Sequence, residues 1–282
     1  MMATASADMS VTRCGNLEFR WGERTYVMGI INVTPDSFSG DGLAGDVAAA
    51  VEQARRFAAE GADIIDVGGE STRPGSVPVS AAEELRRVLP VIERLAAEVP
   101  LSISIDTYKP EVARRAVAAG ATMLNDIWGL KHDPALAQVA AEHGLPLVLM
   151  HNQHGTLYRH LITDILASLR RSIGLALAAG VAWQNIIIDP GIGFGKDLGQ
   201  NLEVMRRLEE FRVLGRPMLL GTSRKSMIGR VLNLPLTERL EGTAATLAIG
   251  IAKGVDMVRV HDVGYMVRVA RMSDAIVRRR PT

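Results

Sequence analysis

The feature that most constrains the fold of this chain is a regular alternation between short apolar runs and longer stretches with helical spacing. Eight runs are apolar almost throughout, instead of alternating apolar with polar residues: Tyr26–Val33, Asp63–Val67, Leu101–Ile105, Thr122–Leu124, Leu145–Met150, Asn185–Ile188, Pro217–Leu220 and Asp256–Val260. Such runs are typical of parallel strands that are buried on both faces. The pattern therefore predicts a parallel sheet covered by helices.

The stretches between these runs read as helices. The clearest are Ala48–Ala59, Ala81–Glu98, Glu111–Ala119 and Glu238–Lys253. Glycine follows several helical stretches, where a helix commonly ends in a left-handed residue: Gly61, Gly120, Gly144, Gly180 and Gly254. Eight strand–helix units in about 250 residues predict an α/β fold of the (β/α)8 TIM-barrel type, with an open doubly wound sheet as the alternative.

The chain is expected to form a single domain. No linker or low-complexity tract divides its 282 residues, and 48% of them are apolar, which leaves ample material for one large core. We expect the barrel to span residues 26–282. Residues 1–25 are expected to be a lead-in with a short hairpin near Gly15 and Gly22.

Charge and cysteine content narrow the classes of function. Lys and Arg number 32 against 31 Asp and Glu, so no global surface for polyanions is expected and nucleic acid is not an expected partner. The single cysteine, Cys14, excludes an internal disulfide. The sequence shows neither a signal-peptide pattern nor an apolar run long enough to span a bilayer. We therefore expect a cytoplasmic protein without a membrane partner.

Polar side chains stand at the carboxyl ends of the predicted strands. In a barrel of this type these positions form the active site. Taken alone, Asp66, Asp126 and Asp133 each favour a turn or helix-capping role, but the set as a whole predicts a catalytic mouth. Its members are Asn32, Asp66, Glu70, Asp106, Asn125, Asp126, His151, Asp189, the segment Ser223–Ser226, Arg259 and His261.

Several connections carry groups that suit anions. Thr72 and Arg73, in the second long loop, are residue types that bind phosphate. Ser223–Ser226 leads into a predicted helix start, where hydroxyls and backbone N–H groups can hold an anion. Arg259 and His261 are two residues apart on a strand and are predicted to form a second anion clamp.

The glycine-rich connection Asp189–Lys196 matches neither the P-loop nor the dinucleotide-binding pattern. Its glycines are expected to allow a tight turn that brings the backbone close to a ligand.

The sequence offers no strong site for a transition metal. His151, His154 and His160 lack the spacing of a zinc site and a thiolate partner, so zinc is disfavoured. Magnesium needs few protein ligands when a substrate phosphate supplies others, so Asn32 alone could hold Mg²⁺. No Ser/His/Asp triad or nucleophile elbow is present. The residues alone thus predict a barrel enzyme that binds a phosphorylated heterocycle.

Seven segments, in order along the chain, resemble the motifs of the dihydropteroate synthase family, pterin-binding barrels of folate biosynthesis and targets of sulfonamides. They are NVTPDSFS at Asn32–Ser39, DVGGESTRPG at Asp66–Gly75, SIDTYKPEVA at Ser104–Ala113, NDIWG at Asn125–Gly129, DPGIGFGK at Asp189–Lys196, SRKSMIG at Ser223–Gly229 and RVHDV at Arg259–Val263. The resemblance covers roughly residues 26 to 280. The loop His151–Thr156 departs from the family pattern.

The resemblance implies a transferase reaction between two small molecules, a dihydropterin diphosphate and p-aminobenzoate, that yields 7,8-dihydropteroate and diphosphate. It implies that Asp189, Asn125 and Asp106 bind the pterin, and that Asp106 stabilises positive charge on its methylene group. Mg²⁺ at Asn32 is expected to neutralise the leaving diphosphate. The residues expected to share the charge of the diphosphate are Thr72, Arg73, Arg259 and His261.

The resemblance also implies where the second substrate binds. Lys225 is expected to lie between the two substrates, and Ser226 is expected to bind the benzoate carboxylate at a helix start. The expected walls of the ring site are Phe38, Pro74 and Phe194. The expected catalytic residues are then Asp106, Lys225, Arg259 and His261. Members of the family are typically homodimers, so a homodimer is expected here.

Two other functions fit parts of the pattern. A pterin-barrel methyltransferase that passes a methyl group from methyltetrahydrofolate to a corrinoid protein shares the carboxylate and amide groups. It does not require the SRKS segment or the NVTPDSF loop. A non-catalytic pterin-binding barrel leaves the groups for Mg²⁺, diphosphate and benzoate unexplained.

Overall fold

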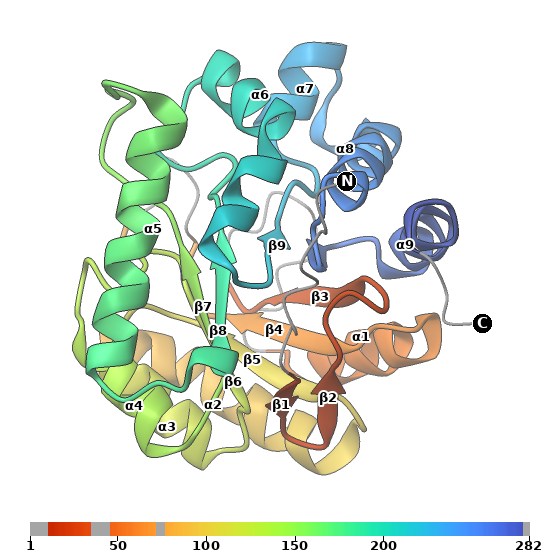
Figure 1. The fold of residues 1–282 in the computed structure, drawn as a ribbon. Coiled ribbons are helices and arrows are strands. Elements are labelled where there is room, and N and C mark those ends of the chain that lie inside the picture. Colours follow the sequence, from red (N-terminus) through yellow and green to blue (C-terminus); the bar gives the residue numbers. More distant parts are fainter. Residues whose placement is uncertain (1–10, 35–45, 72–76, 279–282) are drawn as a thin grey trace.

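The computed structural model describes residues 11–34, 46–71 and 77–278. In these residues a parallel eight-stranded sheet curls into a nearly closed barrel with helices outside (Figure 1). Its strands follow the order β8-β7-β6-β5-β4-β3-β10-β9, and a parallel bridge between Ile188 and Met218 joins the two end strands. The predicted TIM barrel is thus confirmed, and the open sheet is excluded.

Each strand overlaps one of the eight predicted runs, and four strands continue one or two residues past the predicted end. The bounds of the strands are β3 Tyr26–Asn32, β4 Ile64–Gly68, β5 Ser102–Asp106, β6 Met123–Asp126, β7 Leu147–Met150, β8 Ile186–Asp189, β9 Leu219–Leu220 and β10 Met257–Val260. The run at Pro217–Leu220 gives only a two-residue strand, since Pro217 cannot donate to a ladder and Met218 makes the isolated bridge to Ile188.

The four helical stretches named from the sequence are confirmed, with bounds that differ by up to two residues. The helices are α1 Val47–Glu60, α2 Ala81–Glu98, α3 Pro110–Ala118, α4 Ala135–Glu142, α5 Leu161–Ala178, α6 Leu198–Arg206, α7 Ser226–Leu232, α8 Leu240–Ala252 and α9 Val263–Val277, with 3-10 turns η1 Trp183–Asn185, η2 Leu208–Leu214 and η3 Leu236–Glu238. All five glycines predicted to end helices have positive φ; Gly61, for example, has φ 96° and donates to the carbonyls of Ala58 and Phe57. No helix of the described segments is long and apolar enough to cross a membrane.

An amino-terminal hairpin closes one end of the barrel. Strands β1 Thr12–Cys14 and β2 Leu17–Phe19 pair antiparallel through a turn at Gly15, near the predicted position, and lie toward the reader in Figure 1. Phe19, Trp21 and Tyr26 pack ring on ring, with centroids 4.8–5.4 Å apart. They join Cys14 in one buried cluster with side chains from the barrel interior: Met28, Ile64, Met123, Val148, Ile187, Leu219 and Met257.

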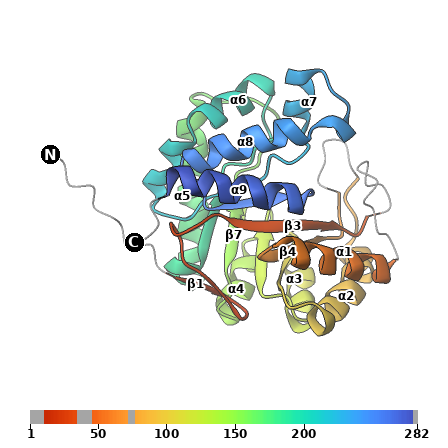
Figure 2. The ribbon, with the colours of Figure 1, turned by 90° about the vertical axis from the view of Figure 1, so that its right-hand side faces the viewer.

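The side chains inside the barrel change from apolar to polar along the strands. The polar layer lies two residues beyond the apolar layer described above. Side chains at i and i+2 of a strand point to the same face, so the residues after the apolar interior layer also point inward. There the sequence places Asp66 after Ile64, Asn125 after Met123, Asp189 after Ile187 and Arg259 after Met257. Figure 2 shows β3 from the side, running from the hairpin end toward the opposite end of the barrel. The interior is thus apolar at the hairpin end and polar at the mouth.

The hairpin cluster gives a testable prediction for stability. Phe19 is fully buried, so Phe19→Ala should lower the free energy of unfolding by about 3–5 kcal/mol through lost burial and a residual cavity. Urea unfolding followed by circular dichroism measures this. The control is Val213→Ala, at a side chain 65% exposed, for which a change below about 0.5 kcal/mol is expected. A loss under about 1 kcal/mol for Phe19→Ala would contradict its place in the core.

Candidate active site

Four polar residues of the predicted site stand at the carboxyl ends of strands on one side of the sheet order, β3, β5, β6 and β8. In the sheet register Asn32 of β3 pairs with Gly68 of β4, Gly68 pairs with Asp106 of β5, and Asp106 pairs with Asn125 of β6. Asp189 ends β8 in register with Met150 of β7. The topology therefore gathers these side chains at one mouth, as predicted.

A buried ion cluster lies at the centre of this mouth. Arg259 of β10 donates from Nε to Asp66 Oδ2 at 2.5 Å and from Nη2 to Asp106 Oδ2 at 2.8 Å. Asn125 Nδ2 donates to the same Asp66 oxygen at 3.0 Å. Asp66 has no exposed surface. One carboxylate thus orients both the guanidinium and the amide of the site.

The interpretation of Asp66 as a turn or capping residue was wrong. It lies inside β4 and belongs to the polar interior layer, because it follows Ile64 by two positions. The same reading was right for Asp126 and Asp133. Asp126 accepts hydrogen bonds from the backbone N–H groups of Trp128 and Leu130, and Asp133 accepts one from Ala135. An acid two residues after an interior apolar residue was the signal that distinguished Asp66.

Asp106 has one carboxylate oxygen free for a ligand among the described residues. Its Oδ2 accepts from Arg259, whereas its Oδ1 is buried without a hydrogen-bond partner there. Burial raises the pKa of Asp106 well above the usual aspartate range, and the negative Asp66 adds to this while Arg259 opposes it. A buried carboxyl group with a raised pKa and an open oxygen is typical of a functional site.

Lys225 and the loop after β8 form the second part of the mouth. Lys225 donates from Nζ to the carbonyl oxygen of Ile192, and the ammonium lies 4.6 Å from the centroid of the Phe194 ring. Burial lowers the pKa of Lys225 to about 8, and the nearby carboxylate of Asp189 acts against this. Asp189 is itself buried and accepts from Gly191 N at 2.7 Å. The structure therefore brings together the predicted residues Asp189, Phe194 and Lys225.

The glycines of this loop pack closely against other parts of the protein. A Cβ on Gly191 would stand 1.8 Å from the backbone oxygen of His151, and one on Gly195 would stand 2.6 Å from that of Gln153. A Cβ on Gly193 would meet Lys225 Cδ at 3.0 Å. The glycines thus allow close packing against the β7 loop and Lys225, and the approach of this backbone to a ligand stays a prediction.

The predicted pair Arg259 and His261 serves two different parts of the mouth. His261 lies with its Nδ1 3.0 Å from Ser223 Oγ, and this hydroxyl also accepts from the backbone N–H of His261 at 3.1 Å. The neighbouring Arg224 binds Asp262 through two hydrogen bonds of 2.9 and 2.5 Å. These contacts tie the start of the Ser223–Ser226 segment to the end of β10. Ser226 is the exposed first residue of α7.

A second buried network joins the predicted residue Glu70 to residues that the sequence reasoning missed. Lys109, which precedes α3, donates at 2.5 Å to both Glu70 and Glu84, and Tyr108 donates to Glu70 at 2.8 Å. Glu84 is almost fully buried on α2, on the same helix face as Val88. A glutamate within an apolar helical stripe was the signal for it. The network holds the segment that leads from β4 into the second long loop.

Four predicted residues lie outside the described residues: Phe38, Thr72, Arg73 and Pro74. Their roles stay predictions.

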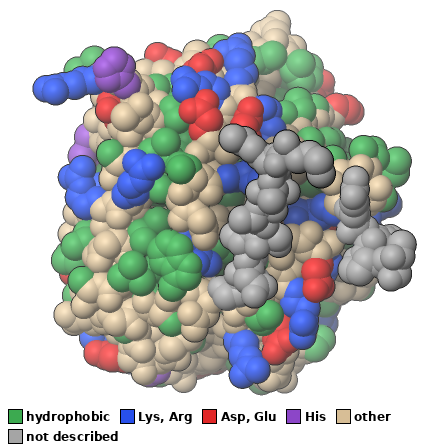
Figure 3. Space-filling view, in the orientation of Figure 1, with side chains coloured by type: hydrophobic (Ala, Val, Ile, Leu, Met, Phe, Trp, Pro, Cys, Tyr) green, Lys and Arg blue, Asp and Glu red, His purple; other side chains and the backbone are tan. Residues whose placement is uncertain are grey.

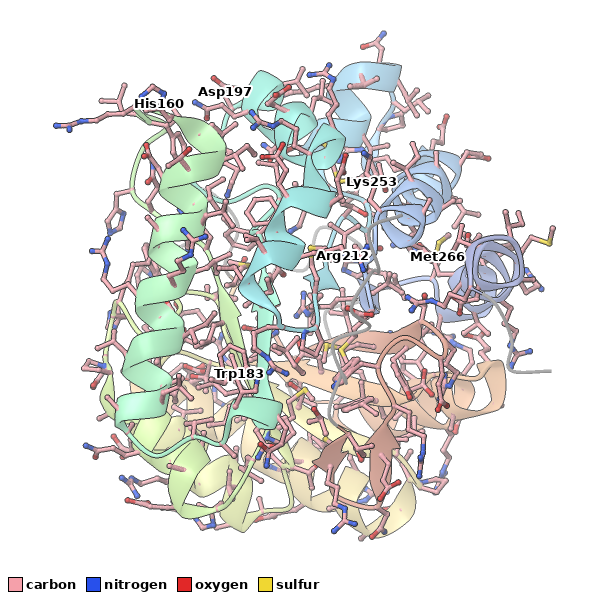
Figure 4. The ribbon with its side chains drawn as sticks, in the orientation of Figure 1. His160, Trp183, Asp197, Arg212, Lys253 and Met266 are labelled. Atoms are coloured by element: carbon pink, nitrogen blue, oxygen red, sulfur yellow. The ribbon has the colours of Figure 1, made fainter. Side chains whose placement is uncertain are left out.

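The three histidines considered for zinc do not converge. His151 is buried, with Nδ1 3.0 Å from Lys196 Nζ. The His154 ring packs on Trp128 with centroids 4.9 Å apart. His160 is exposed at the start of α5 (Figure 4). Among the residues that the structure describes, no group of three or more His, Cys, Asp or Glu could hold a metal ion.

Charged side chains of both signs are interspersed on the face shown in Figure 3, with no large area of a single sign. The net charge of +1 agrees with this mixture. The ion pairs of the mouth are instead largely buried, and salt therefore screens them less than it screens charges on this face.

Comparison with known proteins assigns the family. A family model described as "Pterin binding enzyme" matches residues 28–261. The dihydropteroate synthase of Bacillus subtilis is 56% identical over 255 residues, which cover 90% of each chain. That of Clostridium beijerinckii is 55% identical over 268 residues, covering 95% of this chain and 100% of the relative. Nothing among these relatives favours the methyltransferase.

Solved structures agree. The dihydropteroate synthase of Clostridium difficile, crystallised in the presence of pteroic acid, superposes with a TM-score of 0.89 at 52% identity, covering 93% of this chain and 100% of that one. The Yersinia pestis enzyme in complex with a sulfonamide drug gives a TM-score of 0.89 at 40% identity, covering 95% and 98%. The chain therefore belongs to the pterin-binding enzymes and, within them, to the dihydropteroate synthases.

Proposed function

We propose that this chain condenses (7,8-dihydropterin-6-yl)methyl diphosphate with 4-aminobenzoate to 7,8-dihydropteroate and diphosphate, in the mouth formed by residues of the 26–282 barrel. The observation that carries the proposal is the buried cluster of Asp66, Asp106, Asn125 and Arg259 beside Asp189 and Lys225. This set provides hydrogen-bond acceptors for a heterocycle and cations for a diphosphate. The pteroic acid and sulfonamide named for two solved relatives support both halves of the substrate pair.

The pterin is held by groups whose remaining hydrogen-bonding atoms fit its amino-pyrimidine edge. Asn125 uses Nδ2 on Asp66, so its Oδ1 accepts from the pterin. Asp189 uses Oδ1 on Gly191 N, so its Oδ2 accepts a ring or amino N–H group. Hydrogen bonds to an ionised acceptor are about twice as strong as neutral ones. Asp189 is thus the main anchor of the pterin.

Asp106 stabilises charge in the reacting group. In the reaction the bond between the methylene carbon and the diphosphate oxygen breaks, and its electron pair leaves with the diphosphate. The methylene carbon gains positive charge until the aryl amine forms the new C–N bond and releases a proton. A carboxylate fixed nearby favours this charge, and Asp106 offers its unshared Oδ1. The amine is neutral at neutral pH, so no strong general base is needed.

The groups around Asn32 fit Mg²⁺ bound with the diphosphate. A Cβ on Gly68 would lie 3.8 Å from Asp106 Oδ2 and 3.9 Å from Asn32 Oδ1, so both oxygens lie close to this glycine and near each other. Mg²⁺ prefers oxygen ligands and keeps several waters when a substrate phosphate supplies the rest. When bound, it would neutralise charge on the leaving group. Arg259 and His261, with Thr72 and Arg73, complete the diphosphate site.

The aminobenzoate lies between Lys225, the Phe194 ring and the start of α7. The ammonium of Lys225 lies over the Phe194 ring and contacts the Ile192 carbonyl, so it stands where the two substrates meet. Ser226 binds the carboxylate, and Phe38 and Pro74 complete the wall of the ring site. Lys225 is therefore a contact of both substrates.

The reaction is tested by measuring diphosphate release from the dihydropterin diphosphate with Mg²⁺, in the presence and absence of 4-aminobenzoate. Release that depends on 4-aminobenzoate and forms dihydropteroate is expected. Because Mg²⁺ offsets the charge of the leaving group, addition of EDTA should abolish release, and excess Mg²⁺ should restore it. Full activity in EDTA would remove the proposed role of Asn32, and no release under any condition would refute the synthase activity.

Asp106→Asn should lower turnover much more than pterin affinity, because the neutral amide keeps the shape but loses the charge. A drop in kcat of about 10²-fold or more is expected, the size seen when one electrostatic group is removed, whereas binding of the pterin substrate by calorimetry should change little. The raised pKa of Asp106 also predicts a rise of kcat/KM with pH, as the carboxyl group ionises above the usual aspartate range. This acidic limb should be absent in the variant. Equal losses of turnover and affinity would make Asp106 a binding residue only.

We further propose that the enzyme is a cytoplasmic homodimer that pairs through α8 and α9. These helices lie side by side on one flank of the barrel (Figures 1 and 2). Apolar side chains on them are exposed, among them Ile249 (50%), Tyr265 (56%), Met272 (63%) and Ile276 (71%). On α9 the last three follow helical spacing and so form one stripe. Exposed apolar surface of this kind marks an interface.

The dimer proposal is tested with Met272→Glu and Ile276→Glu together, since two charges in the stripe oppose burial. Light scattering should give about twice the chain mass of 30.4 kDa for the wild type and the single mass for the variant. Glu203→Lys, which places a charge change on α6 outside the stripe, is the control and should remain a dimer. A monomeric wild type at micromolar concentration would contradict the proposal.

A further inference from the structure

The proposed function leaves Lys196, the last residue of the glycine-rich loop after β8, without a role. Only 8% of this lysine is exposed, and lysine is almost never buried to this extent unless its charge is paired. The burial of this charged side chain therefore needs an explanation, which its hydrogen bonds provide.

The Lys196 ammonium has three acceptors for its three N–H donors. Nζ lies 2.8 Å from Gly191 O, 3.0 Å from Phe194 O and 3.0 Å from His151 Nδ1. In its charged form Lys196 carries three donors and no acceptor, so His151 Nδ1 is then the unprotonated acceptor of the contact. Burial, helped by the charge of Lys196, lowers the pKa of His151 to about 2. The imidazole is thus neutral and carries its proton on Nε2.

The loop that Lys196 ties together is the one that shapes the site. The backbone N–H of Gly191 donates to Asp189 at 2.7 Å, and the carbonyl of Ile192 receives Lys225. The Phe194 ring lies under the same lysine at 4.6 Å. The two carbonyls that bind Lys196 belong to Gly191, which donates to Asp189, and to Phe194, whose ring contacts Lys225.

Contacts from outside the loop reach its centre at Gly193 and its far end at Gly195. Asn201 Oδ1 accepts from Gly193 N at 2.6 Å, and Tyr158 donates to Gly195 O at 2.8 Å. Gly191, Gly193 and Gly195 all have positive φ, at 73°, 85° and 57°, so their own conformational preferences hold the loop only weakly. Lys196 is the one side chain in the described part of the chain that bonds to two carbonyls of this loop at once.

We propose that Lys196 is a positioning residue for the synthase reaction: its ammonium holds the Gly191–Phe194 segment in the shape that presents Asp189, Lys225 and Phe194 to the two substrates. The proposal rests on the proposed function, which assigns the substrate contacts of those three residues. Lys196 itself acts through the loop.

The charges around Lys196 set the conditions of the test. Asp189 favours the ammonium form, whereas Lys225 and Lys131 oppose it, and burial is the largest influence, lowering the pKa of Lys196 to about 7. The three-donor form therefore dominates below neutral pH, and kinetics are best compared at about pH 6.

The test compares Lys196→Met, which keeps the length of the side chain but removes its donors, with Arg216→Met. Arg216 is an equally buried cation, 6% exposed, that donates to Ile186 O at the start of β8, the opposite end of that strand. Lys196→Met should raise KM for both substrates at least roughly tenfold, while kcat changes less than about threefold. Arg216→Met should lower Tm and leave both KM values within about twofold of wild type.

Two outcomes would overturn the proposed role of Lys196, and a third would overturn the proposed synthase function on which that role rests. A Lys196→Met enzyme with wild-type KM values and a lower Tm or active fraction would reduce Lys196 to a structural role. An equal rise of KM in Arg216→Met would show that any buried cation has this effect. If the wild type itself releases no diphosphate, the proposed function fails instead.

A measurement on the wild type keeps the proposal falsifiable should Lys196→Met fail to fold. Nitrogen-15 NMR of labelled histidine distinguishes the two ring tautomers, and the chain has 6 histidines to resolve. His151 should show a protonated Nε2 and an unprotonated Nδ1 from about pH 5 to 7, because Nδ1 accepts from the ammonium. A protonated Nδ1 at this site would overturn the contact and the proposal with it.

Discussion

A carboxylate with no exposed surface, Asp66, is the constraint around which the mouth of the barrel is arranged. A charge buried in this way is strongly destabilising unless it is paired and hydrogen-bonded. Arg259 and Asn125 both bind one oxygen of Asp66, and Arg259 continues to Asp106. The three strands that carry Asp66, Asp106 and Arg259 are thereby held in one electrostatic unit. The position of each substrate-binding group at this centre follows from that pairing.

The charged centre and the apolar hairpin cluster occupy opposite ends of the barrel interior. At the hairpin end, aromatic rings from residues 19–26 close the interior and pack on one apolar residue from nearly every strand. Two residues further along, the inward positions are polar. Because apolar side chains exclude water from one side, the charges at the other side interact in a medium of lower dielectric constant. The raised pKa of Asp106 and the lowered pKa of Lys225 are both consequences of this burial.

Much of the fold followed from the sequence because each unit obeys a local rule. Continuous apolar runs predicted the strands, and glycines such as Gly61 predicted helix ends with positive φ. Strand β9 came out shorter than its run, since Pro217 lacks an N–H group and strand length depends on partners that a single sequence does not display. The predicted residues at strand ends also met, because parallel strands end at the same edge.

The rest of the site could not be predicted, since it depends on contacts between distant segments. Asp66 looked like a turn residue because its pairing with Arg259 spans 193 positions of the chain. Glu84 and Lys109 come together only after α2 and α3 have packed. Lys196 gave no signal beyond its motif, since two of its acceptors are backbone carbonyls and its third, His151, follows a different strand, β7. Residues that orient others are therefore harder to find from sequence than residues at strand ends.

The lone cysteine of the chain lies within the hairpin cluster. Cys14 has no exposed surface, and burial raises the pKa of its thiol to about 11. Reaction with a thiol reagent requires the thiolate and access to it, so the folded protein protects this sulfur until the hairpin leaves the barrel. Cys14 therefore becomes reactive only when the hairpin end of the barrel, opposite the mouth, opens. The rate at which Cys14 is labelled reports when that end comes apart, separately from the site where substrates bind.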